Sequence, residues 1–162
     1  MKDLKIEKNS EQFMRLAIEK SLESVDNGGG PFGAVVVKDG EVLAAASNTV
    51  TIDNDPTAHA EVNAIRMACK KLGTFNLSGC EIYASCEPCP MCLSAIYWAR
   101  IDTLYYANTK IDADKIGFSD SFIYEEFSKP ESQRNIKVVK MLRNEAIKAF
   151  ERWENKEDKI EY

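Results

Sequence analysis

Apolar and polar residues alternate with recognisable periods along most of the chain. In residues 11–25 the apolar side chains recur every three or four positions, which predicts an amphipathic helix. Two short apolar runs follow at residues 33–38 and 41–47, with Asp39-Gly40 between them. An Asp-Gly pair between two such runs is typical of a tight hairpin, so these runs predict two antiparallel strands.

Helix and strand patterns continue to alternate along the rest of the chain. Asp55-Pro56 opens a helical pattern that Gly73 stops, because proline suits a first helical turn and glycine suits a helix end. The further predicted helices are residues 57–72, 90–99 and 144–155, the further predicted strands are residues 81–84, 103–107 and 136–141, and short helical pieces are predicted near residues 112–116 and 124–127. This order predicts an α/β layered fold with a mixed sheet, in which the first pair of strands is antiparallel and the later strands are parallel.

Composition changes this picture mainly by exclusion. With 162 residues, of which 44% are hydrophobic, the chain is expected to form a single domain, residues 1–162, with a real core. A net charge of −5 without a dense cluster of Lys and Arg argues against a nucleic-acid partner. No apolar run approaches the ~18 residues of a membrane span, and the N-terminal stretch lacks the apolar centre of a signal peptide. We therefore expect a cytoplasmic protein with no membrane partner, whose thiols stay reduced.

The candidate chemistry is concentrated in SCEPCPMC, residues 85–92, which contains Cys86, Cys89 and Cys92. A disulfide is disfavoured in a reducing compartment, and the odd total of five cysteines agrees with this. An iron–sulfur site would require a fourth cysteine soon after the third, and the next residues supply none. A closed zinc knuckle and one wall of a catalytic metal site are both compatible with the spacing alone.

His59 is the only histidine in the chain, and Glu61 follows it two positions later. A right-handed crossover places the starts of the two helices at the same edge of the sheet, which brings His59, Cys89 and Cys92 together. His59 and Glu61 can face one site only if His59 lies at the helix end, because positions two apart inside a helix differ by roughly 200°. Three ligands with an open position and a neighbouring carboxylate form a hydrolytic arrangement, whereas a structural zinc-binding interaction module has no use for Glu61.

These residues resemble the signature of the zinc-dependent nucleobase and nucleoside deaminases, with HAE at residues 59–61 and PCPMC at residues 88–92. The resemblance implies a three-layer αβα cytidine-deaminase-like fold with a five-stranded mixed sheet. It also implies one zinc ion per chain, held by His59, Cys89 and Cys92. Glu61 would then be the catalytic acid and base, and Cys86 would lie outside the ligand set.

Further segments resemble the purine-directed branches of these enzymes. GPFGAVVVKDG, residues 30–40, is similar to both guanine deaminases and tRNA adenosine deaminases, whereas GFSDSFIYEEF at 117–127 and KIEY at 159–162 are similar to bacterial guanine deaminases. The tRNA enzymes typically carry basic helices near the C-terminus, but this chain ends in the mixed to acidic WENKEDKIEY. Without such cations an RNA substrate would lose its main source of affinity. The resemblance therefore implies hydrolysis of the free base guanine to xanthine and ammonia, with tRNA adenosine deamination and cytosine deamination as alternatives.

The resemblance also gives functional roles to residues that have ordinary structural interpretations when taken alone. Asp120 would be a second catalytic acid that bonds the guanine amino group, although a lone loop carboxylate is normally solvated. Asn48 would read a purine edge with its amide, and Phe32 and Trp98 would stack on the flat ring. The full implied set of substrate-binding residues is Phe32, Asn48, Ala60, Trp98 and Tyr162.

A homodimer is expected in this family, and the C-terminal segment suggests a particular form for it. We expect residues 142–162 to be exchanged between subunits, which is a low-cost route to a dimer. Tyr162 would then cover a catalytic pocket and exclude water from it. The alternative is a solvated tail that frays, as chain ends commonly do.

Overall fold

The computed structural model describes residues 2–162, with side chains from residue 10 onward. Its chain divides into two compact units, Met1–Asp120 and Ser121–Tyr162, and each is described by itself. The first unit contains, in chain order, α1 (Lys2–Asp26), β1 (Gly33–Lys38), β2 (Glu41–Ser47), α2 (Val50–Asp53), α3 (Ala60–Leu72), β3 (Cys80–Cys86), α4 (Pro90–Trp98), β4 (Thr103–Asn108) and α5 (Lys110–Lys115). The second unit contains α6 (Ser121–Ser128), the short 3₁₀ helix η1 (Glu131–Gln133) and α7 (Arg143–Glu154). No helix of the described residues is long and apolar enough to cross a membrane.

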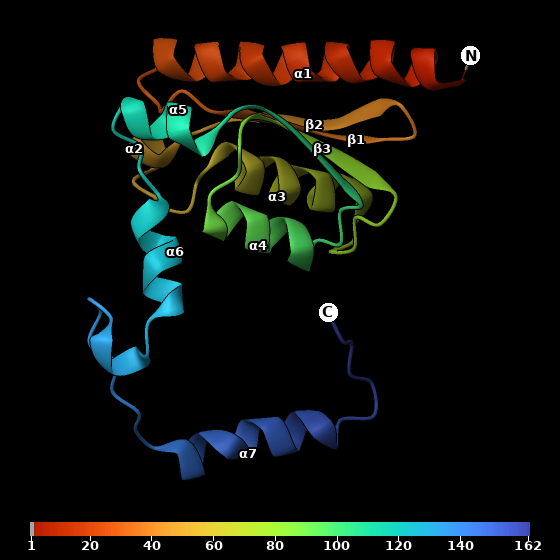
Figure 1. Cartoon of the computed structure of the whole chain (residues 1–162). Helices are drawn as coiled ribbons and strands as arrows, with labels where there is room; N and C mark the ends of the chain where they lie inside the picture. Colours follow the sequence, from red (N-terminus) through yellow and green to blue (C-terminus); the bar gives the residue numbers. More distant parts are fainter. Residues whose placement is uncertain (1) are drawn as a thin grey trace. The chain divides into compact units, whose positions relative to one another are not determined.

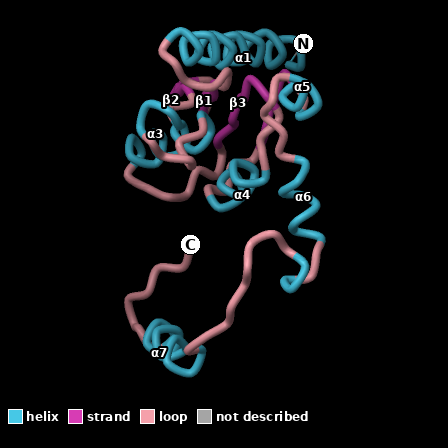
Figure 2. The backbone as a smooth tube through the Cα atoms, turned by 90° about the vertical axis from the view of Figure 1, so that its left-hand side faces the viewer, coloured by secondary structure: helices cyan, strands magenta, loops and turns pink. Residues whose placement is uncertain are grey.

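The first unit is built in three layers around a four-stranded sheet of order β2-β1-β3-β4. β1 pairs antiparallel with both β2 and β3, whereas β3 and β4 are parallel. Helix α1 packs on one face of this sheet, and α3 and α4 lie on the other face (Figure 1, Figure 2). The predicted α/β layering, the antiparallel hairpin and the parallel pairing of the later strands are thus confirmed.

β1 shows how the sequence positions these layers. Ala34 and Val36 point into the cluster formed with α3 and α4, whereas Val35 and Val37 point into the cluster formed with α1. Because successive strand side chains alternate between faces, an apolar run of this length is buried on both sides. Burial of each valine side chain contributes about 1.5–3 kcal/mol, so β1 is the strand around which both helical layers assemble.

The close packing of α1 on the sheet depends on Gly33, the first residue of β1. A Cβ atom added to Gly33 would lie 2.2 Å from the Ala17 carbonyl oxygen and 2.6 Å from the Ser21 nitrogen. No side chain can be accommodated at these distances, so the α1 backbone can approach the strand only where glycine occurs. The Gly33 N–H donates to Ser85 Oγ at 3.0 Å, which joins the start of β1 to the end of β3.

The predicted fifth strand at residues 136–141 is wrong. Residues 137–142 have no regular structure, and the sheet of the described chain contains four strands. The sequence there has the β-branched and apolar residues of a strand, but strand formation also requires a neighbouring strand that accepts and donates hydrogen bonds. Ile136 and Met141 are instead 78% and 74% exposed, so the apolar pattern is not covered by other residues of this chain.

The starts of two helices also differ from the prediction. α1 begins at Lys2, well before residue 11. α3 begins at Ala60, because the Asp55 carboxylate accepts hydrogen bonds from the Thr57 N–H at 2.8 Å and the Thr57 hydroxyl at 2.7 Å. This side-chain turn competes with helix formation. The residues just before α3 therefore form a loop, which leaves His59 at the helix end.

None of the described residues of the second unit is fully buried. Glu126 on α6 holds the following loop, because its carboxylate pairs with Lys129 at 2.6 Å and accepts from the Asn135 N–H at 2.7 Å. No residue of α7 is buried within the part of the chain that the structure describes. Phe150 and Trp153 of α7 are 74% and 42% exposed, so an apolar helix face here is uncovered.

Candidate active site

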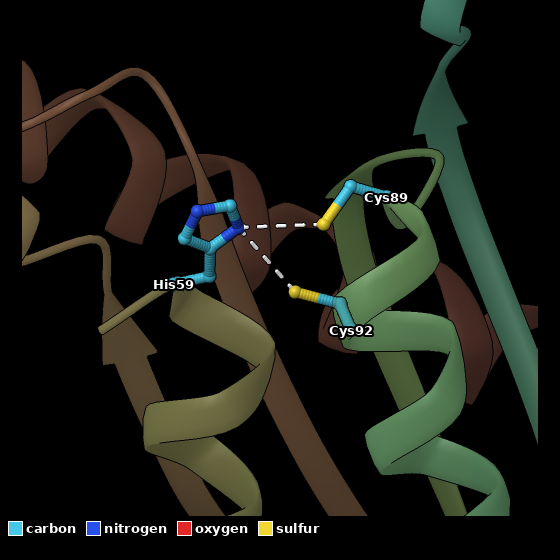
Figure 3. Close-up of side chains that lie close together, drawn as sticks. All are labelled: His59, Cys89 and Cys92. Carbon is cyan, nitrogen blue, oxygen red and sulfur yellow. Dashed lines mark hydrogen bonds between the residues drawn. The ribbon is translucent and has the colours of Figure 1, made fainter. Parts of the chain in front are cut away.

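Three side chains converge where α3 and α4 begin. His59 is the N-cap residue of α3, Cys89 is the N-cap residue of α4, and Cys92 lies in the first turn of α4. Their side chains point toward one another, with His59 Nδ1 3.6 Å from Cys89 Sγ and 3.5 Å from Cys92 Sγ (Figure 3). The three ligand atoms all lie within 4.8 Å of one another.

These separations fit a tetrahedral zinc ion. Zinc binds nitrogen at about 2.0–2.1 Å and sulfur at about 2.3 Å, so a tetrahedral site separates the nitrogen and sulfur ligands by about 3.6 Å. The two Nδ1–Sγ distances, 3.6 and 3.5 Å, match this value. The side chains are thus arranged as a zinc-ligand set, with Nδ1 as the ligand atom of His59. Three protein ligands leave a fourth position for water or substrate, as in catalytic zinc sites.

The electrostatics of the cluster also favour a cation. A hydrogen bond from the Cys92 thiol lowers the pKa of Cys89 to about 4, and hydrogen bonding with His59 adds to this effect. The same bond with Cys89, together with burial, raises the pKa of Cys92. Cys89 is therefore a thiolate at neutral pH while Cys92 keeps its proton, and both sulfurs lie at a helix N-terminus, where negative charge is stabilised. A divalent cation bound here would take the place of the proton on Cys92.

Cys86 does not belong to this cluster. Its Sγ donates to the Thr109 carbonyl oxygen at 3.6 Å, and burial raises the pKa of its thiol to about 11. Among the residues whose side chains are described, the group that could hold a metal contains His59 and the later two cysteines only. The structure therefore separates the three cysteines of the motif into two ligands and one buried thiol.

Glu61 lies in the first turn of α3, next to the fully buried Ala60. The Glu61 side chain is buried, and burial raises the pKa of its carboxyl above the ordinary value. A carboxyl group whose pKa lies above its ordinary value takes up a proton more readily than an exposed carboxyl group, which suits general acid–base chemistry. His59 has an extended backbone at the helix end, outside the regular turns of α3. His59 and Glu61 can therefore face one site although they are only two positions apart.

Asn48 and Phe32 form a second part of the region. The buried Asn48 follows β2, and its N–H donates to the Phe32 carbonyl oxygen at 3.0 Å. The Thr49 N–H donates to the Ala58 carbonyl oxygen at 3.0 Å, so the Asn48 segment lies against the residue that precedes His59. The Asn48 side-chain oxygen accepts from the Val50 N–H at 3.2 Å, which leaves the Nδ2 amide as the donor of this side chain.

Asp120 lies near the same region, at the end of the first unit. Burial raises the pKa of its carboxyl, and the negative charge of Cys89 raises it further, which requires the two groups to be close. Sequence reasoning missed Phe118, two residues earlier, whose ring packs edge-to-face on the Phe32 ring with centroids 5.1 Å apart. The only sequence signal for Phe118 is its position inside the GFSDSF stretch.

Two predicted substrate-binding residues are not brought to this region by the first unit. Trp98 is the last residue of α4, 64% exposed, and lines a surface depression with Tyr97 and Arg100. It lies six residues after Cys92, which is about 9 Å along the helix axis and away from the metal ligands. Tyr162 ends the second unit, so its proposed place over a pocket stays a prediction.

The comparison with protein families defines the class. The chain belongs to the cytidine and deoxycytidylate deaminase family, because the model of its zinc-binding region matches residues 7–108. This confirms the resemblance noted in the sequence, including the cytidine-deaminase-like α/β fold and the zinc-binding character of the family. His59, Cys89 and Cys92 form the group that could hold this metal.

Within this family, the chain is similar along almost its whole length to the guanine deaminase of Bacillus subtilis (strain 168). The two sequences are 52% identical over 155 residues, which are 95% of this chain and 99% of that protein. The crystal structure of that enzyme covers 94% of this chain and 98% of its own, with a TM-score of 0.91. A guanine deaminase structure from Nitrosomonas europaea matches at 32% identity and a TM-score of 0.65, over 74% of this chain and 66% of its own.

Similarity to RNA-directed members of the family is shorter. The tRNA-specific adenosine deaminase of Aquifex aeolicus is 41% identical over 97 residues, which are 60% of this chain and 64% of that protein. The similarity to that enzyme thus leaves more than a third of the chain unmatched.

Proposed function

We propose that this protein catalyses the hydrolysis of guanine to xanthine and ammonia. The observation that carries the proposal is the open zinc-ligand set of His59, Cys89 and Cys92, with the buried Glu61 carboxyl beside it. The similarity to the B. subtilis guanine deaminase along 95% of the chain supports guanine as the base.

The residues of the chain supply the proton transfers. A zinc ion held by these ligands would lower the pKa of a bound water from ~15.7 toward ~7. Glu61 takes a proton from the attacking water and delivers it to a ring nitrogen, which leaves a hydroxyl group and the amino group on C2. Glu61 then takes the proton of that hydroxyl and delivers it to the amino group, so that the C2–N bond breaks and C2 becomes a carbonyl. Asp120, whose carboxyl pKa is raised by burial, shares the second transfer. One water is consumed, and the C2 amino group leaves as ammonia.

The contacts of Asn48 favour guanine over adenine. The hydrogen bond from the Val50 N–H to the Asn48 side-chain oxygen fixes the orientation of the amide, with the oxygen toward Val50 and the Nδ2 donor on the other side. Guanine offers a carbonyl oxygen at C6, which accepts such a hydrogen bond, whereas adenine has an amino group at C6, which donates. Phe32, with Phe118 packed against its ring, provides an aromatic wall for a flat base.

The test of this function is ammonia release from a panel of free bases. We expect guanine to be turned over at least ~10²-fold faster than adenine or cytosine, because a buried amide donor rejects a base that cannot accept its hydrogen bond. Conversion of adenosine in a tRNA anticodon stem-loop, with no release from guanine, would instead assign the chain to the RNA-directed branch. Zinc binding without ammonia release from any substrate would leave a structural zinc module.

We further propose a homodimer in which residues 142–162 are exchanged between subunits. The uncovered apolar residues of the second unit support this, because exposed Phe150 and Trp153 on α7 cost hydrophobic free energy unless another surface covers them. In this arrangement Tyr162 would close the pocket of the partner subunit. We also propose a cytoplasmic location, because a reducing compartment keeps the free thiols of Cys89 and Cys92 available for zinc.

A further inference from the structure

Asn63 connects the two loops that carry the base-reading and metal-binding residues. It lies in the second turn of α3, half-buried, and its Nδ2 amide is 3.0 Å from the Ser47 carbonyl oxygen. The same Nδ2 is 3.0 Å from Thr49 Oγ1 and 3.3 Å from the Ala58 carbonyl oxygen. Ser47 and Thr49 flank Asn48, and Ala58 directly precedes His59.

The orientation of this amide is fixed by chemistry. A carbonyl oxygen can only accept hydrogen bonds, so the NH₂ side of Asn63 must face Ser47 and Ala58. Two amide hydrogens therefore serve three acceptors from two separate segments. A side chain of the same shape with an oxygen in place of Nδ2 would put an acceptor against both carbonyl oxygens and push the two segments apart.

Other contacts also hold these loops. The backbone bond from the Thr49 N–H to the Ala58 carbonyl oxygen joins the same two segments, but it reaches only one flank of Asn48. On the α1 side, Ser24 Oγ donates to the Asn48 carbonyl oxygen at 2.9 Å. At the surface, Arg66 contacts Asp55 at 3.7 Å and Thr57 at 3.4 Å, one turn further along α3. Arg66 is exposed, and such surface pairs contribute little. Asn63 is thus the side chain of α3 that reaches both flanks of Asn48.

We propose that Asn63 is a positioning residue that sets the selectivity for guanine by fixing Asn48 relative to the start of α3. This inference rests on the proposed function, because it assigns Asn48 the reading of the C6 oxygen. The mechanism is geometric: loss of the three hydrogen bonds lets residues 47–49 move, so that the Asn48 donor no longer meets the base. Since α3 itself stays in place, the zinc ligands are retained.

The variant Asn63→Asp tests this inference, because it keeps the shape and removes the donor. We expect kcat/KM for guanine to fall about 10- to 100-fold, mainly through KM, since misplacement by 1 Å can cost about 10². Selectivity for guanine over 2,6-diaminopurine, which has an amino group in place of the C6 oxygen, should fall at least tenfold. Zinc content should stay at the parent level.

Arg66→Leu is the matched control on the same helix, and we expect its kinetic constants to stay within twofold of the parent. Thr49→Val removes one acceptor without changing Asn63 and should raise KM several-fold, which keeps the test available if Asn63→Asp does not fold.

Parent-like KM and selectivity in both Asn63→Asp and Thr49→Val, or a loss of activity that follows a loss of zinc, would overturn the inference. A parent that releases no ammonia from guanine would overturn the proposed function and the inference together, whereas unchanged variants of an active parent would overturn the inference alone.

Discussion

Glu61 is the carboxylate on which the proposed chemistry depends. Its position beside the metal ligands allows its role in proton transfer to be tested apart from zinc binding and folding. It is buried beside the zinc ligands but is not one of them. Glu61→Gln preserves size and removes the charge, so we expect parent-like zinc content and melting temperature with turnover reduced by ~10²–10⁴-fold or more. Zinc analysis, thermal unfolding and an ammonia-release assay measure these three quantities.

The control for this variant is Glu81→Gln. The Glu81 carboxylate accepts from the Tyr83 hydroxyl at 2.6 Å, and Tyr83 belongs to the α1 side of the sheet. We expect its turnover to remain near that of the parent. Activity of Glu61→Gln within a few-fold of the parent would show that another group moves the protons.

The three cysteines of the motif differ in a way that zinc content reveals. Cys89 and Cys92 face His59, whereas the Cys86 thiol donates to the Thr109 carbonyl oxygen, a bond that a serine hydroxyl can also make. Cys86→Ser should therefore retain about one zinc ion per chain after dialysis against a weak chelator, and Cys89→Ser should lose it, because it removes one of only three protein ligands. If Cys86→Ser lost zinc as completely as Cys89→Ser, the site would have four protein ligands and no open position.

At the scale of elements, the sequence predicts helices and strands well where neighbouring residues determine them. It predicts them poorly where they depend on contacts with distant parts of the chain. The hairpin, the apolar β1 and the helix start at Pro90 follow from local signals. The meeting of His59, Cys89 and Cys92 follows from two such helix starts together with the handedness of the crossover that joins them. The strand predicted at residues 136–141 fails because strand formation depends on a neighbour that this chain does not provide within its described residues. Residues such as Asn63 and Phe118 escape prediction for the same reason, because their contacts join segments far apart in sequence.

At the scale of the whole molecule, the two units differ in how well they are packed. The first unit buries apolar residues on both faces of its sheet. The second unit leaves Phe150, Trp153 and Ile160 exposed, although their burial would stabilise the fold by about 1.5–3 kcal/mol each. An exchanged dimer would cover them with a second copy of the chain.

Deletion of residues 157–162 tests whether the C-terminal tail is a lid. On our proposal, zinc content and folding survive, because this segment has no buried residue. Guanine turnover falls tenfold or more, because the loss of Tyr162 admits water to the pocket and weakens the electrostatic interactions inside it. Tyr162→Ala, with the rest of the tail intact, measures the contribution of the aromatic ring apart from that of the tail backbone. Unchanged turnover in the truncated chain would rule out the lid.

Mixing the truncated chain with Glu61→Gln then distinguishes a lid on the same subunit from one on the partner. If tails are exchanged, a mixed dimer has one complete site, formed by the intact Glu61 of the truncated chain and the intact tail of the other. Equal mixing with random re-association makes half of the dimers mixed, so about a quarter of the sites regain activity. If each tail covers its own pocket, every site in the mixed dimer lacks either Glu61 or the tail, and activity stays at the level of the separate variants. Mass spectrometry of the mixed dimer must first show that subunits exchange, because only then does the absence of recovery assign the lid to its own subunit.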